Sequence, residues 1–102
     1  MIRGAVHRIN LGDEKRGHEQ RGRRFGVVLS VTDWSMVTVV PTSTSAQPSR
    51  FRPEVELNGQ LIRLLVDQIR SIDTDYVHDL VGFLAGEDLD GLETAVRRYL
   101  RL

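Results

Sequence analysis

The chain has 102 residues, with 14 basic and 14 acidic side chains, so its net charge is zero and does not steer it toward nucleic acid or a membrane. This length fits a single domain over residues 1–102 and leaves no room for a second core. The absence of cysteine excludes disulfides, thiolate nucleophiles and cysteine-ligated zinc. No apolar run approaches the roughly 20 residues that span a bilayer, and residues 1–8 do not resemble a signal peptide. We therefore expect a cytoplasmic domain that does not contact a membrane.

Alternating polar and apolar residues at the start predict a strand over about residues 2–11. The next segment, Gly12–Arg24, carries three glycines and many charges but no apolar residue, which is typical of a loop. It is longer than the usual connection of about 4–6 residues, and such long loops are often functional.

Two apolar, β-branched runs predict buried strands over residues 25–32 and 36–40, and the second is expected to end at Pro41. The polar segment 42–49 has no strand or helix pattern, so it is predicted to be a second loop.

The second half of the chain begins with a hairpin signal. Residues 52–57 and 60–66 flank Asn58-Gly59, the strongest two-residue turn signal, and are predicted to pair as antiparallel strands. Residues 67–73 predict a short return strand with a polar start.

Only the C-terminal end predicts a helix, because Leu89, Leu92 and Val96 recur at three- and four-residue spacing. Acidic residues precede this pattern and arginines follow it, an order that complements the helix dipole. We therefore expect a mainly β fold of about five to seven short strands, curled into a small sheet or barrel, with one helix packed on it.

The first candidate site is the arginine-rich loop Lys15–Arg24. Arginine presents a rigid fork of donors that matches phosphate oxygens, and Gly17 and Gly22 let the backbone approach a ligand closely. Composition alone favours a solvated charged loop, since most charge runs are solvated faces and motif matches produce false positives.

A second candidate is the hydroxyl-rich run Pro41–Ser45, which directly follows a buried strand. Its hydroxyls can bind a phosphate or move a proton, although such side chains more often bond to turn backbone. Asp67 stands where an apolar strand becomes polar, and it is either a general base, a partner that orients an arginine, or a simple turn cap. We expect any chemistry to occur where the arginine-rich loop meets the hydroxyl run.

Several catalytic motifs are missing from the sequence. The three histidines lack metal-ligand spacing, and no phosphate-binding glycine loop, dinucleotide fingerprint or nucleophile elbow occurs. A chemistry without metal or cofactor is then the simplest enzyme hypothesis. Transfer of an RNA phosphodiester to the ribose 2′-hydroxyl fits, because the substrate brings its own nucleophile and the protein supplies a base, an acid and a cation.

Four blocks of sequence point to a known protein family. They are Arg3-Gly4-Ala5-Val6, the segment Gly17-His18-Glu19-Gln20 to Val27-Val28-Leu29-Ser30, the strand end Val39-Val40-Pro41-Thr42-Ser43-Thr44, and Val66-Asp67-Gln68-Ile69-Arg70-Ser71-Ile72-Asp73. In order and spacing they resemble the MazF/PemK (Kid) family of toxin endoribonucleases, and the resemblance covers nearly the whole chain. Four blocks in register argue against chance.

The resemblance implies an SH3-like, CcdB/PemK-type small barrel with a C-terminal helix, acting as a homodimer. It also implies the toxin of a type II toxin–antitoxin system: a metal-independent, sequence-specific endoribonuclease that leaves 2′,3′-cyclic phosphate and 5′-hydroxyl ends and inhibits translation and growth. No cofactor is expected. The expected partners are single-stranded messenger, transfer or ribosomal RNA, and a MazE-like antitoxin whose flexible acidic tail occupies the RNA groove.

The resemblance also assigns roles to residues. Arg24 aligns with the family's catalytic arginine, which should stabilise the phosphorane, and Ser43 occupies the place of the catalytic threonine. Asp67 or Glu19 is the expected base, with His18 assisting. The expected RNA contacts are Gln20, Arg21, Arg23, Thr42, Thr44 and Gln68.

Three positions depart from the family's pattern. Phe25 stands where a proline usually follows the catalytic arginine, and Ser43 keeps the hydroxyl of the threonine but not its methyl. Leu65 occupies the place of an arginine that acts in catalysis in the Kid branch, so the choice between Asp67 and Glu19 as base and the identity of the acid stay open. The short segment 31–36 replaces a sequence-reading loop, so the RNA target cannot be carried over.

Two other functions compete with RNA cleavage. A non-enzymatic, CcdB-like toxin that binds gyrase would use the same barrel, but that branch lacks the pair formed by Arg24 and Ser43. A plain SH3-like peptide-binding module would need an aromatic-lined groove, whereas aromatic residues make up only 6% of this chain.

Overall fold

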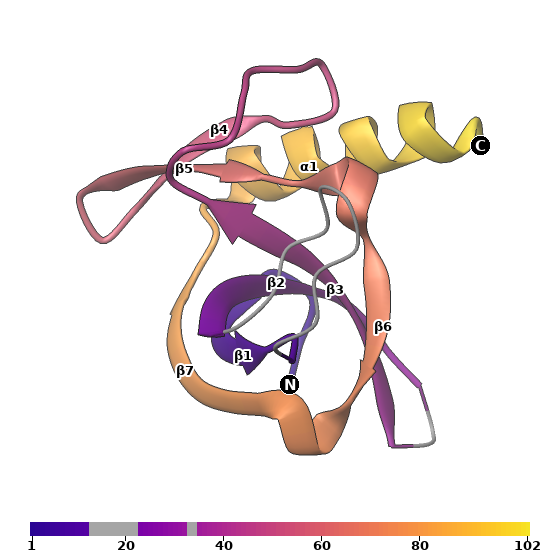
Figure 1. Ribbon diagram of the computed structural model, residues 1–102. Coiled ribbons are helices and arrows are strands. Elements are labelled where there is room, and N and C mark those ends of the chain that lie inside the picture. Colours follow the sequence, from indigo (N-terminus) through magenta and orange to yellow (C-terminus); the bar gives the residue numbers. More distant parts are fainter. Residues whose placement is uncertain (13–22, 33–34) are drawn as a thin grey trace.

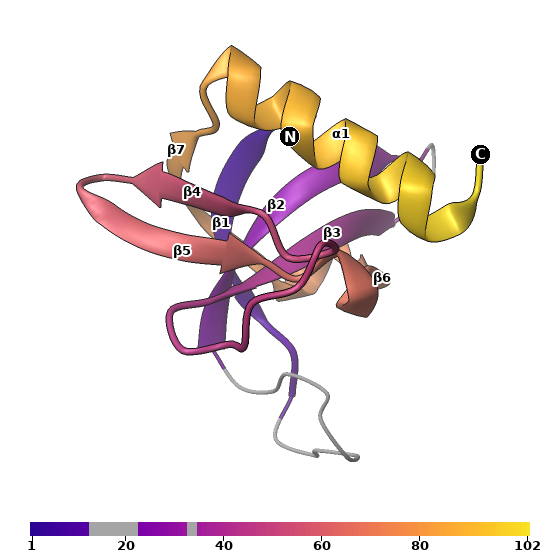
Figure 2. The same ribbon diagram turned by 90° about the horizontal axis from the view of Figure 1, so that it is seen from above.

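The structure is a computed structural model that describes residues 1–12, 23–32 and 35–102. Over these residues the chain forms a seven-stranded antiparallel sheet that curls into a half-barrel, with one helix across its end (Figures 1 and 2). The mainly β architecture with a C-terminal helix agrees with the sequence prediction. The elements are β1 (Ala5–Asn10), β2 (Arg23–Val31), β3 (Met36–Ser43), β4 (Glu54–Leu57), β5 (Gln60–Leu64), η1 (Val66–Gln68), β6 (Arg70–Asp73), η2 (Thr74–Tyr76), β7 (Val77–Phe83) and α1 (Gly86–Leu100).

Strand β3 is the centre of the sheet, because it pairs with three other strands. One edge of β3 pairs with β2. The other edge pairs first with β6, over Met36–Val39, and then with β5, at Thr42 and Ser43.

Pro41 lies between these two pairings, and its carbonyl accepts the N–H of Leu65 at 2.8 Å. The amide position and carbonyl of one strand residue face the same edge, so the missing N–H of Pro41 falls where β3 changes partner and removes no bond to β2. The prediction that the strand ends at Pro41 is therefore wrong, because β3 continues through Ser43.

The predicted hairpin is confirmed as β4 and β5, although β4 begins at Glu54. Asn58 and Gly59 both have positive φ, 51° and 82°, as a tight two-residue turn between twisted strands requires. At the other side of the sheet, β1 lies between β2 and β7, and its pairing with β7 shifts register on both sides of His7.

The predicted strand over residues 67–73 is only partly correct. Asp67 and Gln68 belong to the 3-10 turn η1, in which the Gln68 and Ile69 amides donate to the Leu65 and Val66 carbonyls. The strand β6 begins only at Arg70. The turn carries the chain from β5 to β6 across the point where β3 changes partner.

Helix α1 covers the larger of two groups of core residues. It buries Leu92, Ala95 and Val96 against Val6, Val27, Val40 and further residues of the sheet. Its acidic first turn and basic last turn complement the helix dipole, as predicted. Figure 2 shows α1 lying along one side of the strands, away from the end of the sheet where β1 and β2 lead into the segment drawn in grey.

A second group of core residues lies between β1, β2, β3 and β6 and includes Ile9, Val28 and Val39. Ile9 packs directly on Gly26 of the neighbouring strand. A β-carbon added to Gly26 would lie 2.6 Å from the Ile9 δ-methyl and 3.3 Å from its γ-methylene carbon. Because Ile9 is fully buried, it has little room to move away.

We therefore expect Gly26→Ala to lower the free energy of unfolding by about 1–3 kcal/mol, the usual range for overpacking a core. The control is Gly91→Ala in α1, where the added methyl meets no neighbour. That change should raise the free energy of unfolding by up to about 1 kcal/mol, because alanine favours the helix. Urea unfolding at one fixed protein concentration measures both values. An unchanged or higher free energy of unfolding for Gly26→Ala would contradict this prediction, because it would mean that the Ile9 side chain can move aside.

Candidate functional site

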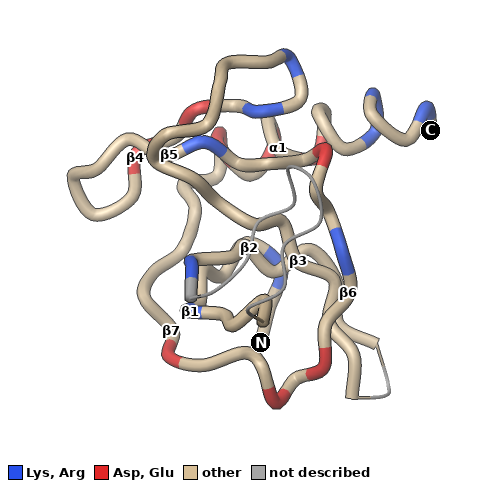
Figure 3. The backbone as a smooth tube through the Cα atoms, in the orientation of Figure 1, with Lys and Arg blue, Asp and Glu red and all other residues tan. Residues whose placement is uncertain are grey.

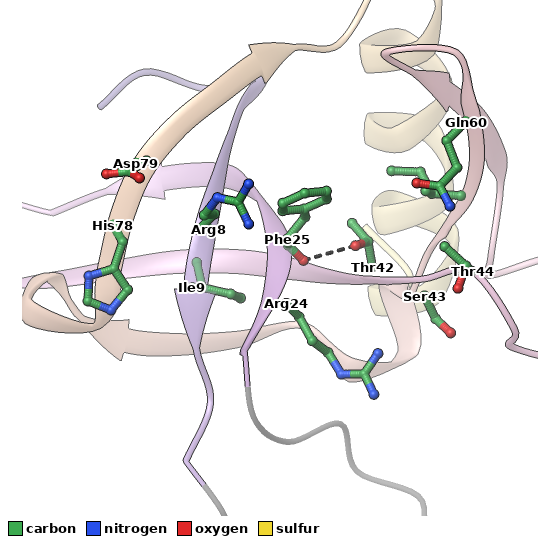
Figure 4. A pocket seen from close by; sticks show the side chains of 11 residues that line it. Arg8, Ile9, Arg24, Phe25, Thr42, Ser43, Thr44, Gln60, His78 and Asp79 are labelled. Atoms are coloured by element: carbon green, nitrogen blue, oxygen red, sulfur yellow. Dashed lines mark hydrogen bonds between the residues drawn. The ribbon is translucent and has the colours of Figure 1, made fainter.

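A cleft of about 570 Å³ opens beside β1 and β2, with β7 on one side and the ends of β3 and β5 on the other (Figure 4). Strands β1 and β2 supply Arg8, Ile9, Arg24 and Phe25. Their neighbours bring residues distant in sequence to the same cleft: Thr42, Ser43, Thr44, Gln60, Ile62, His78 and Asp79.

Arg24 stands at the start of β2, where it pairs with Ile9 of β1. It was predicted to belong to a loop, but the strand begins one residue earlier, at Arg23. Arg24 is partly buried, and Figure 4 shows its guanidinium extending toward the side of the cleft that holds Ser43. The sheet therefore fixes the backbone of Arg24, which a flexible loop would not do.

Three consecutive hydroxyl residues at the end of β3 line the cleft, but they have different surroundings. The Thr42 hydroxyl donates to the Phe25 carbonyl at 3.0 Å, so its proton is used to tie β3 to β2. The Ser43 Oγ accepts the Ser45 N–H at 3.2 Å, which leaves its own O–H proton for a ligand. Thr44 follows the strand and is exposed. These three residues therefore form part of one cleft wall, and the role predicted for their hydroxyls stays a prediction.

Phe25 and Arg8 are direct cross-strand partners on β2 and β1. The guanidinium carbon of Arg8 lies 5.3 Å from the centroid of the Phe25 ring, which is a cation–π contact. Arg8 is exposed and Phe25 is partly buried, so the pair forms part of the cleft surface.

The cleft is also lined by His78, Asp79 and Gln60, which no sequence pattern predicted. The first two lie on β7, and the His78 carbonyl accepts the Nδ1 of His7 at 2.9 Å. No motif marks these positions, because β7 reaches the cleft only through its irregular pairing with β1. Gln60 is placed by the hairpin turn, which the sequence does reveal, but its position in the same cleft as Ser43 depends on the short pairing of β5 with β3.

Charge around the cleft is positive locally although the chain is neutral. Figure 3 shows basic positions on β1 and β2, and acidic positions on β7 and between β6 and β7. Arg8 and Arg24 therefore stand on the floor of the cleft and Asp79 on its far wall. Such an arrangement suits an anionic ligand that enters along the floor.

Asp67 and Gln68 do not line this cleft. Asp67 accepts two hydrogen bonds from Arg52, from Nε to Oδ1 at 3.0 Å and from Nη2 to Oδ2 at 2.9 Å. The hydrogen bond to Asp67 raises the pKa of Arg52, against a smaller opposing effect of burial and with a further contribution from the charge of Asp67. Leu65, which stands where the Kid branch has an arginine, is fully buried and carries no charge. The guanidinium beside Asp67 comes from Arg52 instead.

Several predicted site residues lie outside the described residues. His18, Glu19, Gln20 and Arg21 fall in the segment 13–22, and the side chain of Arg23 is not described. In the described ranges, no group of three or more histidine, aspartate or glutamate side chains could hold a metal ion. In the same part of the chain, no helix combines the length and apolar character needed to cross a membrane.

Known proteins resemble this chain along almost its whole length. Residues 2–100 match the family described as PemK-like, MazF-like toxin of type II toxin–antitoxin system. A candidate toxin of Mycobacterium tuberculosis (strain ATCC 25618 / H37Rv) is 59% identical over 105 residues, which cover 100% of this chain and 99% of that protein.

Solved structures confirm the predicted CcdB/PemK-type architecture. MazF from Deinococcus radiodurans superposes with a TM-score of 0.84 over 98% of this chain and 96% of that chain, at 22% identity. An endoribonuclease in complex with its cognate antitoxin, from a mycobacterial species, gives 0.80 over 100% and 96% at 18% identity. At these identities the likeness establishes the fold.

The bidentate pair of Arg52 and Asp67 should stabilise the fold measurably, because both side chains are mostly shielded from solvent, with exposures of 18% and 31%. A double-mutant cycle of Arg52→Ala and Asp67→Ala should give a coupling of about 1 kcal/mol. The raised pKa of Arg52 means that the contribution of its charged form is complete at neutral pH and is lost as the pH rises through the arginine range. A matched cycle on Arg3 and Glu93, which lie 3.7 Å apart and are more exposed, should give less. Equal couplings in urea unfolding would contradict the structural role of the Arg52 pair.

Proposed function

The chain belongs to the PemK-like, MazF-like toxin family of type II toxin–antitoxin systems, and on that premise we propose that it is an endoribonuclease acting at the cleft of Arg24 and Ser43. The substrate is single-stranded RNA, and the reaction uses no metal ion. One observation carries the proposal: β2 and β3 bring an arginine and a hydroxyl, the two groups that the family's chemistry needs, into one cleft.

The reaction transfers a phosphodiester within the RNA. The ribose 2′-oxygen attacks the adjacent phosphorus, and the bond from phosphorus to the 5′-oxygen breaks. A proton leaves the 2′-oxygen to a base, and another reaches the 5′-oxygen from an acid. The products are therefore a 2′,3′-cyclic phosphate and a 5′-hydroxyl. Because the nucleophile belongs to the substrate, the protein contributes position and charge.

Arg24 is assigned to the negative charge that develops on the phosphorane oxygens. Its planar fork can donate two parallel hydrogen bonds to a phosphate group. Ser43 contributes a third donor, because the Ser45 amide fixes its oxygen while its proton can point into the cleft. Donors that are already oriented lower the barrier more than mobile donors, since they need no reorganisation during the reaction.

The base is assigned to Glu19, with His18 assisting. Both oxygens of Asp67 accept bonds from Arg52, and Asp67 does not line the cleft, which favours a positioning role for it in η1. Glu19 and His18 precede Arg24 by only a few residues in the chain. Thr44 keeps the RNA contact that the family implies, as do Gln20, Arg21 and Arg23, whereas the Thr42 hydroxyl is bonded to the Phe25 carbonyl and Gln68 does not line the cleft.

The biological partners follow from the same cleft. A flexible acidic tail of a MazE-like antitoxin would occupy the positions that RNA phosphates occupy, through Arg8 and Arg24. The toxin acts in the cytoplasm, where cleavage of RNA stops translation and growth. The gyrase-binding branch lacks the pair of arginine and hydroxyl, so the presence of both groups supports RNA cleavage instead.

We expect the purified protein to cut single-stranded RNA in the presence of EDTA, with ends that map as cyclic phosphate and 5′-hydroxyl. Arg24→Ala should lower the rate at least about 100-fold, because it removes the main electrostatic stabiliser. Ser43→Ala should lower it about 10-fold or more, whereas Ser43→Thr should keep activity because it keeps the hydroxyl.

Arg98→Ala is the control, since Arg98 is exposed in the last turn of α1 and outside the cleft. It should cut RNA like the wild type. Intact RNA in every transcript pool, or activity that EDTA abolishes and Mg²⁺ restores, would refute the proposed reaction. Recovery of gyrase by the protein while RNA stays intact would instead support the CcdB-like alternative.

We also expect a homodimer, because the family resemblance implies one and small folds gain stability by association. Sedimentation equilibrium at micromolar concentration should give twice the chain mass of 11.6 kDa. Exposed apolar side chains such as Leu80 and Phe83 of β7 are available for such a contact. A mass of one chain at that concentration would contradict the dimer.

A further inference from the structure

The geometry points to a nucleobase-binding subsite formed by Phe25 and Arg8, next to the Arg24 that is proposed to hold the scissile phosphate. This inference rests on the proposed function and names how the cleft holds one base of its RNA. The ring of Phe25 is the stacking surface, and the Arg8 guanidinium is the group that closes over the base.

Phe25 is positioned to serve a nucleotide whose phosphate lies on Arg24. The two residues are adjacent on β2 and both line the cleft. A nucleotide joins its base to its phosphate through a single sugar, so the two binding groups must lie close together. Among the described lining residues, Phe25 is the only phenylalanine, tyrosine or tryptophan, and every base has a face that can stack on such a ring.

The Phe25 ring is held in place before any ligand arrives. Its backbone is paired with Arg8 of β1, and the Thr42 hydroxyl bonds to its carbonyl. Part of the ring packs against the core group beneath α1, and the rest remains accessible in the cleft. A ring with so little freedom loses little entropy when a base stacks on it.

Arg8 marks the face of the ring that a ligand can use. Its guanidinium lies 5.3 Å from the ring centroid, yet the side chain is exposed to solvent. Stacking of a base on an aromatic ring contributes more than an exposed cation–π contact, so a base can displace the guanidinium. Arg8 can then stack on the other face of the base or bind its phosphate, because a guanidinium does both.

Gln60 and Thr44 complete the subsite at its edge. Both line the same cleft and are exposed, and Figure 4 shows them on the side formed by β3 and β5. An amide and a hydroxyl can each donate and accept hydrogen bonds, which is what recognition of a base edge needs. Stacking on Phe25 therefore supplies affinity, and these two side chains supply preference among bases.

The test uses RNA oligonucleotides that carry the mapped cleavage sequence, with 2′-deoxyribose at the cleaved position so that they bind without reacting. Phe25→Leu keeps apolar bulk but removes the aromatic face, and should weaken binding about 10-fold or more. Phe25→Trp should bind at least as tightly as the wild type. Replacing each base in turn by an abasic site should reveal one position whose loss weakens the wild type but leaves Phe25→Leu unchanged.

Phe51→Leu is the matched control. Arg50 lies over the Phe51 ring at 4.9 Å, so this pair has the same chemistry as Arg8 and Phe25 but stands outside the cleft. The control should keep wild-type affinity and the wild-type abasic profile. Thermal melting of both leucine variants separates loss of folding from loss of the ring.

A fluorescence measurement provides a second readout that a structural role of Phe25 would not produce. In a Trp34→Phe background, Phe25→Trp places a single tryptophan in the subsite. The intact oligonucleotide should quench it, and the oligonucleotide lacking the critical base should not. Equal affinities and equal abasic profiles for the wild type and Phe25→Leu would overturn the subsite while RNA cleavage stands. A wild type that cleaves no RNA would overturn the proposed function instead.

Discussion

The hydrogen bonds of β3 are the constraint on which the rest of the fold depends. One edge of β3 pairs with β2 from Val37 to Pro41, while its other edge is divided between β6 and β5. Pro41 lies at that division, where a missing N–H removes no ladder bond and its carbonyl accepts from Leu65. The change of partner bends the sheet into a half-barrel and brings Ser43 over the start of β2. The position of Ser43 relative to Arg24 thus depends on the hydrogen bonds that β3 makes with β2, β5 and β6.

Much of the fold was predictable from the sequence, because local signals decide it. The hairpin at Asn58-Gly59, the C-terminal helix and the two buried strands all depend on neighbours in the chain. The end of β3 was not predictable, since a proline normally ends a central strand and only the distant Leu65 explains why this one does not. Register shifts in β7 likewise depend on its partner, so His78 and Asp79 gave no signal of their own.

The candidate site was predictable to a different extent. Arg24, Ser43 and Thr44 follow from sequence blocks, and the structure brings them to one cleft. Asp67 follows from the same blocks but lies elsewhere, bound by Arg52. The partnership with Arg52 joins a loop residue to a turn residue across the chain, and no spacing rule relates such positions. Leu65 is apolar and buried, so the guanidinium that binds Asp67 comes from another segment of the chain.

The hairpin of β4 and β5 pairs with β3 at Thr42 and Ser43, and the Asn58 side chain at its tip donates to the Val81 carbonyl of β7 at 3.2 Å. Asn58 and Gly59 are exposed and outside the core, and lengthening such a tip costs only about 0.6 kcal/mol of closure entropy per doubling. Gln60 sits at this tip and faces the cleft. A change in the length or sequence of this hairpin would consequently alter the cleft wall around Gln60, while the floor made by β1 and β2 would keep its own pairing.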